Sequence, residues 1–217
     1  MLIHPWDSAV NDYEWQEWLS HAEKFGVLMV NNVDVDLAPI AVPTHFTLKS
    51  DQILMHLARP NPVWQHIEAA SQIRLVVIGD YAYIPNYWRA KDGDPTELGV
   101  PTSYYATVQF ICQPEIVDDP QGKVDILNEQ FADVQPEGGH ATVDVNSAPY
   151  GPMLPGIRGL KLHIISADAK FKYDDAKPEE FRERVSEELH ARNRRLDPGV
   201  ARQQKRRLGL IGLWRNN

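Results

Sequence analysis

The chain has 217 residues, of which 43% are hydrophobic and 24% charged, which is enough for one domain with a buried core or for one domain and an appendage. No stretch approaches the roughly 18 apolar residues of a membrane-spanning helix, and residues 1–12 lack the basic and apolar pattern of a secretory signal. Cys112 is the only cysteine, so no internal disulfide can form. We therefore expect a cytoplasmic protein with no membrane contact.

The net charge of −8 is distributed unevenly along the chain. From Pro178 onward there are ten Lys or Arg and six Asp or Glu, a net of +4, whereas residues 1–177 hold twelve basic and twenty-four acidic residues, a net of −12. We expect a body over 1–177 and a helical extension over 178–217, packed on the body or on a partner subunit. The basic tail could meet phosphate, including DNA, or another subunit's acidic face, or its charges could be paired along a solvated helix face.

Helical periodicity appears first near the N-terminus. Trp15, Trp18 and Phe25 belong to a set of apolar residues at spacings of three and four, which predicts a helix over 13–25 capped by Asn11 or Asp12. Predicted strands follow in chain order at 27–30, 39–46, 52–58, 74–84, 104–112 and 156–165. Further helices are predicted at 62–70, at 120–135 and over the last forty residues, apart from a break at Asp197-Pro198-Gly199.

Most of the predicted strands follow one another without an intervening crossover helix. This order favours an antiparallel barrel over a doubly wound parallel sheet. The expected fold class is therefore α+β, an antiparallel β-barrel with flanking helices and a helical C-terminal tail.

The common catalytic signatures are missing from the sequence. It contains no Gly-rich phosphate loop, no Gly-x-Ser-x-Gly and no two His at a metal-ligand spacing. We expect no metal site and assign no catalytic acid or base. Cys112 lies among apolar residues of a predicted strand and is expected to be a packed thiol.

Three segments carry candidate binding chemistry. In His56–Pro62, a strand delivers Arg59 to a turn before a helix, where an arginine and free N–H groups could bind an anion. In Gly79–Trp88, several tyrosines could border a planar ligand. Gly99–Tyr105 is a rigid entry into a strand with hydroxyl groups. The alternatives are a surface arginine, half-buried tyrosines at a subunit interface and ordinary strand initiation.

Together these segments resemble the PaiB-like family of FMN-binding split-barrel proteins over about residues 20–210. The family motif His-x-Ala-Arg-x-Asn-Pro-x-Trp is matched by His56, Ala58, Arg59, Asn61, Pro62 and Trp64. Ala82–Trp88, Val100–Tyr105, Gly156–Leu160 and Lys170-Phe-Lys172 follow in the family's order. Ser103-Tyr104 stands where the family has Trp-Asn, and Tyr173-Asp174-Asp175 where it has Ser-Gln-Asn.

The resemblance implies an FMN-binding split barrel that holds flavin at a homodimer interface. Arg59, with His56 and N–H groups near Asn61, would take the phosphate, and Lys170 and Lys172 are further phosphate or dimer contacts. The implied cofactor residues are His56, Ala58, Arg59, Asn61, Tyr83, Pro101, Thr102, Ser103, Tyr104, Tyr105, Lys170 and Lys172. A bound flavin could support a reductase or oxidase reaction. The family also implies a negative transcriptional regulator. The alternative is a non-catalytic dimeric regulatory or partner-binding module that has lost flavin.

Overall fold

A computed structural model describes residues 1–91 and 93–210 of the chain, which form two compact units. Unit 1 contains Met1–Glu23, Ile78–Val108 and the chain from Asp168, and unit 2 contains Lys24–Val77 and Gln109–Ala167. The strands β5 (Ile73–Ile84), β6 (Thr102–Val117) and β7 (Ile157–Lys172) each contribute residues to both units. The units therefore do not coincide with the predicted boundary at residue 177.

The strands form one sheet in the order β2-β1-β5-β6-β7-β4-β3. The pairs β1–β2, β1–β5, β3–β4 and β4–β7 are antiparallel. The predicted α+β class and the predicted antiparallel pairing are therefore confirmed. The order begins at β2 and ends at β3, so the described strands form an open sheet, and closure into a barrel stays a prediction.

Unit 2 contains the shorter strands, which are β1 (Phe25–Val30), β2 (Ile40–His45), β3 (Thr47–Lys49) and β4 (Gln52–Ala58). Its helices are α2 (Trp64–Ala69), α3 (Pro120–Val134) and α4 (Tyr150–Met153), with the 3-10 turn η4 (Leu154–Gly156). The helix α3 begins where the Asp119 side chain accepts the Gly122 N–H, as an N-cap does, and it packs against β3 and β4. Ile126 of α3 is buried in one cluster with Leu54 of β4 and Val117 of β6.

Close strand contact in unit 2 requires a glycine. A Cβ on Gly26 would lie 2.8 Å from the Val76 carbonyl oxygen on the paired strand β5. Cys112 is fully buried on β6, and burial raises the pKa of its thiol to about 12. The thiol is therefore protonated at neutral pH and is packed, as the sequence predicted.

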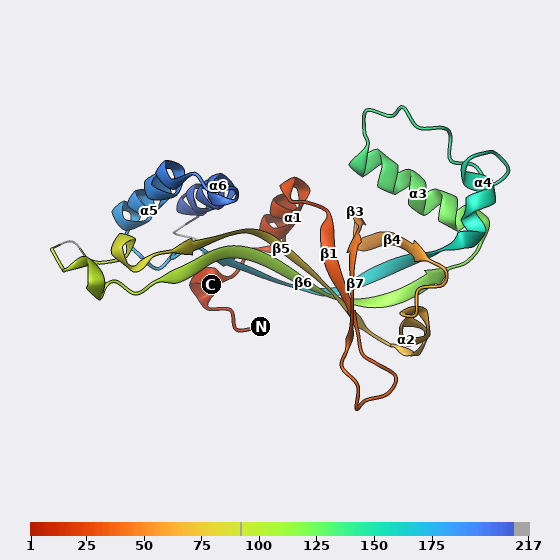
Figure 1. The fold of residues 1–217 in the computed structure, drawn as a ribbon, viewed down its shortest axis with the longest axis horizontal. Helices are drawn as coiled ribbons and strands as arrows, with labels where there is room; N and C mark the ends of the chain where they lie inside the picture. Colours follow the sequence, from red (N-terminus) through yellow and green to blue (C-terminus); the bar gives the residue numbers. More distant parts are fainter. Residues whose placement is uncertain (92, 211–217) are drawn as a thin grey trace. The chain divides into compact units, whose positions relative to one another are not determined.

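Unit 1 contains α1 (Asp12–His21), α5 (Glu179–Arg192) and α6 (Asp197–Leu208), with the 3-10 turns η1 (Pro5–Asp7), η2 (Asn86–Trp88) and η3 (Thr96–Leu98). The helices α5 and α6 lie side by side (Figure 1). They cover one face of the long strands, where Tyr104, Phe171 and Tyr173 are fully buried. On β5 the alternation is clear, because Ala82 and Ile84 are buried while Tyr81 and Tyr83 are each 48% exposed.

Two predicted helix boundaries in unit 1 were wrong, and the strand predicted at 156–165 extends further, to Lys172 at the end of β7. The first helix ends at His21, and Phe25 begins β1 instead, because the chain pairs with β2 from Phe25 onward. At the other end of the helix, Asn11 is the cap. The expected break at Asp197-Pro198-Gly199 is the first turn of α6, where proline is well tolerated. The actual break follows Asn193, which ends α5 in the left-handed conformation with φ 47°. The predicted helical tail over 211–217 lies outside the described residues.

Candidate functional site

The turn between β4 and α2 in unit 2 carries the first group of implied cofactor residues, which are His56, Ala58, Arg59 and Asn61. The Asn61 N–H donates to the Ala58 carbonyl at 3.0 Å, and the Asn61 side chain accepts the Val63 N–H at 3.0 Å. The Trp64 indole N–H also donates to the Ala58 carbonyl, at 2.9 Å. The N–H groups near Asn61 are therefore already used inside the turn, and the motif builds a rigid turn.

Arg59 is held by its neighbours in unit 2. Its guanidinium donates to Asp118 Oδ1 at 3.1 Å and to the Pro155 carbonyl at 2.8 Å. Arg158 binds the same carboxylate at 2.6 Å. Its hydrogen bonds are the main cause of a lowered pKa of Asp118, and the charge of Arg59 adds a smaller effect. The Arg59 side chain is 45% exposed. It can still meet an anion, but the anion would compete with Asp118.

His56 is oriented by a contact with helix α3 and not toward an exposed binding site. Its Nδ1 lies 2.7 Å from Gln130 Oε1, and Gln130 is buried. The His45 ring packs against the edge of His56, with ring centroids 5.3 Å apart. Burial, together with the neighbouring His56, lowers the pKa of His45.

The other implied cofactor residues lie in unit 1. They are Tyr83, Pro101, Thr102, Ser103, Tyr104, Tyr105, Lys170 and Lys172. Tyr104 is fully buried, and its hydroxyl donates to Asp174 Oδ2 at 2.9 Å. Burial, with the Asp174 charge beside it, raises the Tyr104 pKa well above its ordinary value. The Tyr104 side chain therefore faces the packed side of the strands and offers no surface to a ligand.

Thr102, Tyr105, Lys170 and Lys172 form a group that we call the lysine–tyrosine group. The Lys172 ammonium donates to Thr102 Oγ1 at 2.9 Å. The ammonium groups of Lys170 and Lys172 lie 5.8 and 6.0 Å from the centre of the Tyr105 ring. Lys170 also donates to the Leu2 carbonyl at 2.8 Å and lies 4.0 Å from Asp7. Two ammonium groups thus lie near one aromatic ring, and that of Lys172 also binds a hydroxyl group.

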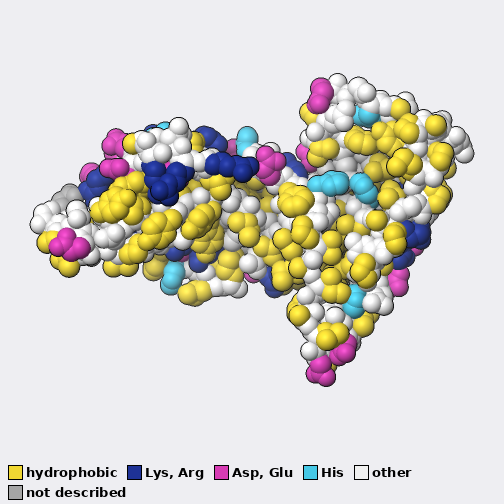
Figure 2. Space-filling view, in the orientation of Figure 1, with side chains coloured by type: hydrophobic (Ala, Val, Ile, Leu, Met, Phe, Trp, Pro, Cys, Tyr) yellow, Lys and Arg dark blue, Asp and Glu magenta, His cyan; other side chains and the backbone are white. Residues whose placement is uncertain are grey.

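Exposed aromatic side chains continue along β5 beside this group. Tyr81 and Tyr83 are half-exposed, Ser103 is half-buried and Pro101 is exposed. Figure 2 shows hydrophobic side chains gathered over this stretch of β5 and β6 in unit 1. The residues suit a planar apolar ligand or a second protein surface.

Two residues that support this part of unit 1 were not predicted. Arg89 forms a two-point ion pair with Asp174, with both hydrogen bonds at 3.1 Å, and the same carboxylate accepts from Tyr104. Asp174 has a positive φ of 58°, which is unusual for a residue with a side chain. The acidic pair Asp174-Asp175, which follows β7 after one residue, was the sequence feature that could have indicated this ion pair. They stand where the family resemblance has Gln-Asn.

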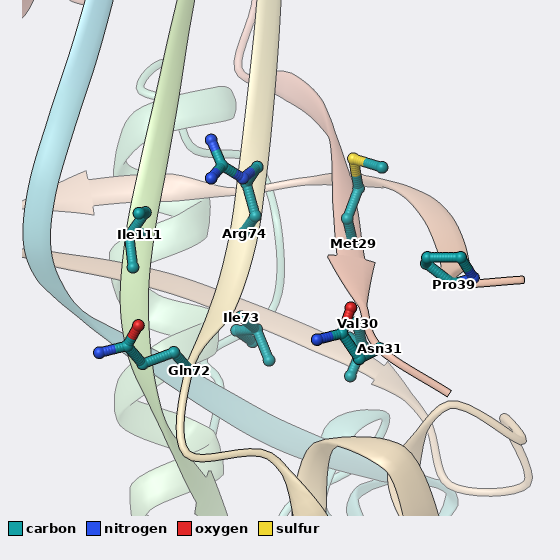
Figure 3. Close-up of a pocket in the computed structure, with 8 residues that line it drawn as sticks. All are labelled: Met29, Val30, Asn31, Pro39, Gln72, Ile73, Arg74 and Ile111. Atoms are coloured by element: carbon teal, nitrogen blue, oxygen red, sulfur yellow. The ribbon is translucent and has the colours of Figure 1, made fainter. Parts of the chain in front are cut away.

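A separate pocket of about 280 Å³ lies in unit 2 (Figure 3). It is lined by residues of β1, β5 and β6 and of the loop before β2, which are Met29, Val30, Asn31, Pro39, Gln72, Ile73, Arg74 and Ile111. Its cation, Arg74, donates to Gln109 Oε1 at 2.7 Å. The pocket contains none of the implied cofactor residues.

The open antiparallel α+β sheet is shared with solved flavoprotein structures. A flavocytochrome from Azotobacter vinelandii matches with a TM-score of 0.59 at 15% identity, over 77% of this chain and 70% of that one. The FAD- and heme-binding protein from Mycobacterium smegmatis matches with a TM-score of 0.55 at 15% identity, over 76% of this chain and 73% of that one. At these identities the likeness shows the fold alone.

Residues 2–166 match the model of the family described as "Putative FMN-binding domain", and this chain belongs to that family. No curated protein sequence matches the chain. The helices α5 and α6 lie beyond the matched residues. Within residues 1–91 and 93–210, no helix has the length and apolar character needed to span a bilayer.

Proposed function

We propose that this chain binds FMN, with the lysine–tyrosine group of unit 1 as its main contact. The observation that carries the proposal is the Lys172 ammonium, which is bonded to the Thr102 hydroxyl beside the Tyr105 ring. Among the described residues, no carboxylate forms an ion pair with Lys172. Its ammonium group is therefore available to an anion, which would also meet the charge of nearby Asp7.

The donor set fits the chemistry of FMN. FMN combines a phosphate with a planar isoalloxazine ring. The Lys172 ammonium and the Thr102 hydroxyl suit the phosphate. Lys170 is the weaker contact, because it is buried and held by the Leu2 carbonyl and Asp7. Tyr83 and Tyr105 offer aromatic surface to the ring, and Pro101 and Ser103 would border it. When bound, FMN supplies redox chemistry that side chains alone cannot.

Arg59 is the alternative phosphate anchor, within unit 2, with His56, Ala58 and Asn61 shaping the turn that carries it. Its bond to Asp118 makes it the weaker candidate, because a phosphate has to displace or share that carboxylate. Tyr104, which bonds to Asp174, would support the strand without touching the flavin. The two candidate anchors, Lys172 and Arg59, are separable by mutation.

We expect Lys172→Gln to weaken FMN binding by about 10-fold to 100-fold, the loss typical of one charge-assisted hydrogen bond. The measurement is quenching of FMN fluorescence on titration with flavin-free protein. Riboflavin, which lacks the phosphate, serves as the comparison ligand. Its affinity should not change in Lys172→Gln if Lys172 contacts the phosphate.

Arg59→Gln is the matched variant for this titration. If only Arg59→Gln weakens FMN binding, the phosphate contact would lie at the turn in unit 2 instead. A wild-type protein that leaves FMN fluorescence and the flavin spectrum unchanged would overturn FMN binding. That result would favour the alternative, a non-catalytic module that has lost flavin.

We also propose a homodimer that forms through the exposed aromatic stretch of β5. Tyr81 and Tyr83 are each 48% exposed on the same face of β5, and exposed apolar patches can mark interaction surfaces. We expect Tyr81→Glu to convert a dimer into a monomer at micromolar concentration, because the new carboxylate would be buried without a partner. Light scattering after size exclusion measures the mass. Val35→Glu, at an exposed position in unit 2, should remain dimeric. A monomeric wild type, or a dimeric Tyr81→Glu, would contradict the proposal.

The finer assignments are proposals of the same kind. A closed split barrel rests on the strand order and the motif resemblance, the PaiB-type regulator role rests on the resemblance alone, and a cytoplasmic location rests on the single cysteine. The basic tail gives little support to DNA binding, because Arg182 and Arg207 are buried in ion pairs and Arg192 pairs with Asp197. Retention on duplex DNA at low salt, where phosphate contacts are strongest, tests that role.

A further inference from the structure

A second pocket lies in unit 1, between the chain after η2 and the start of α5. Its volume is about 470 Å³, within the range of small-molecule sites. It is lined by Arg89, Lys91, Lys177, Pro178, Glu180, Phe181 and Arg184. It shares no residue with the proposed flavin contacts, and most of its lining follows residue 166, where the family match ends. It therefore does not belong to the site already described.

The pocket is strongly cationic in an acidic chain. Four of its lining residues are Lys or Arg and one is Glu, whereas the whole chain has a net charge of −8. Figure 2 shows Lys and Arg side chains gathered over the α5 and α6 side of unit 1. A concave surface lined by one sign of charge concentrates ligands of the opposite sign.

The four cations differ in how they are held. Arg89 is bound to Asp174, and Arg184 donates to the Ala90 carbonyl at 3.3 Å. Lys91 and Lys177, in contrast, have no ion pair or side-chain hydrogen bond to any residue that the structure describes. The charge of Arg89 is thus offset by Asp174, Arg184 is fixed by its hydrogen bond, and the two lysines remain able to bind an anion directly.

The pocket also has an apolar side. The Phe181 ring is half-buried, and the Arg184 guanidinium lies 5.4 Å from its centre. Pro178 adjoins it at the start of α5. An aromatic ring beside several cations suits a ligand with a charged group on a planar or apolar body.

We infer that this pocket binds a small phosphate monoester that carries an aromatic group, with the phosphate on Lys91 and Lys177 and the aromatic group on Phe181. A phosphate monoester carries nearly two negative charges at neutral pH, which matches two lysine ammonium groups. A monocarboxylate would use one of them. Glu180 opposes binding of any anion and limits its affinity.

Adenosine 5′-monophosphate is the probe, and isothermal titration calorimetry measures its binding. We expect the double variant Lys91→Gln/Lys177→Gln to weaken binding about 100-fold, which is tenfold for each charge-assisted hydrogen bond. Glu180→Gln should strengthen it severalfold. Lys205→Gln, at an exposed lysine on α6 outside the pocket, is the matched control and should bind as the wild type does.

Three further titrations separate the possible explanations. Adenosine should bind far more weakly than the monophosphate if the phosphate is the anchor, and inorganic phosphate should bind weakly if Phe181 contributes. Lys172→Gln should leave binding of the monophosphate intact, so that failure of the flavin proposal does not affect this one. Absence of binding by the wild type, or equal binding by the double lysine variant with an unchanged melting temperature, would overturn the inference.

Discussion

Arg207→Ala is expected to lower the free energy of unfolding by about 3–5 kcal/mol, the cost typical of breaking a buried ion pair by removing one partner. Arg207 is 1% exposed, and its guanidinium donates to both carboxylate oxygens of Glu14, at 2.8 and 2.9 Å, and to Asp175 at 2.5 Å. It also donates to the Trp6 and Ser8 carbonyls. One side chain of α6 therefore joins α1, the N-terminal segment and the end of β7.

Urea unfolding followed by tryptophan fluorescence measures this loss. Lys205→Ala is the matched control, because Lys205 lies on the same helix and is exposed. It should change the unfolding free energy by less than about 0.5 kcal/mol. If Arg207→Ala is as mild as Lys205→Ala, Arg206 and Arg182, which already pair with Glu14 and Asp175, are sufficient to compensate these carboxylates. The ion-pair account would then be incorrect.

A chain that ends at Lys177 is expected to lose the fixed packing of unit 1. The helices α5 and α6 bury Val185, Leu189 and Val200 completely, and they cover Phe171 of β7 and Tyr173 directly after it. Exposing such side chains costs about 1.5–3 kcal/mol each, and several together exceed the stability of an ordinary domain. The truncation also leaves Glu14 and Asp175 buried without Arg207 and Arg182.

Near-UV circular dichroism and limited trypsin digestion compare the truncated and intact chains. We expect a weakened aromatic signal and rapid cleavage within residues 78–108. A truncated chain with an unchanged aromatic signal and a cooperative thermal transition would contradict this expectation. It would also establish 1–177 as an independent domain with a separable C-terminal extension.

Local sequence patterns predicted most of the elements. The helix α3 follows from its cap at Asp119 and from an apolar face that includes Val124 and Leu127, all of which are properties of neighbouring residues. The strands β4 and β5 follow from β-rich runs between turn residues. Gln52–Ala58 was predicted with the bounds that it has in the structure. The start of β1 at Phe25 was not predictable in this way, because pairing with β2 decided it.

The candidate site was predictable only as a set of residue types. The sequence indicated that Lys172, Thr102 and Tyr105 could serve one ligand, but contact between them depends on the alignment of β6 with β7. Tyr104 shows the limit, since its neighbours in sequence do not reveal that its hydroxyl bonds to Asp174, seventy residues away. Likewise, only the folded turn shows that Asn61 uses the N–H groups around it.

Apolar periodicity, the order of the predicted strands and the motif order, read from the sequence alone, were sufficient for the α+β class, the antiparallel strands and the relationship to FMN-binding proteins. These depend on periodicity and on short segments, which local chemistry determines. The tertiary structure alone decided what the basic tail does. Its arginines meet Glu14 and Asp175 because packing α5 and α6 on unit 1 brings together charges that lie far apart in the chain. Burial makes the loss of either partner costly, because the remaining charge would be buried without compensation, and no sequence pattern records this.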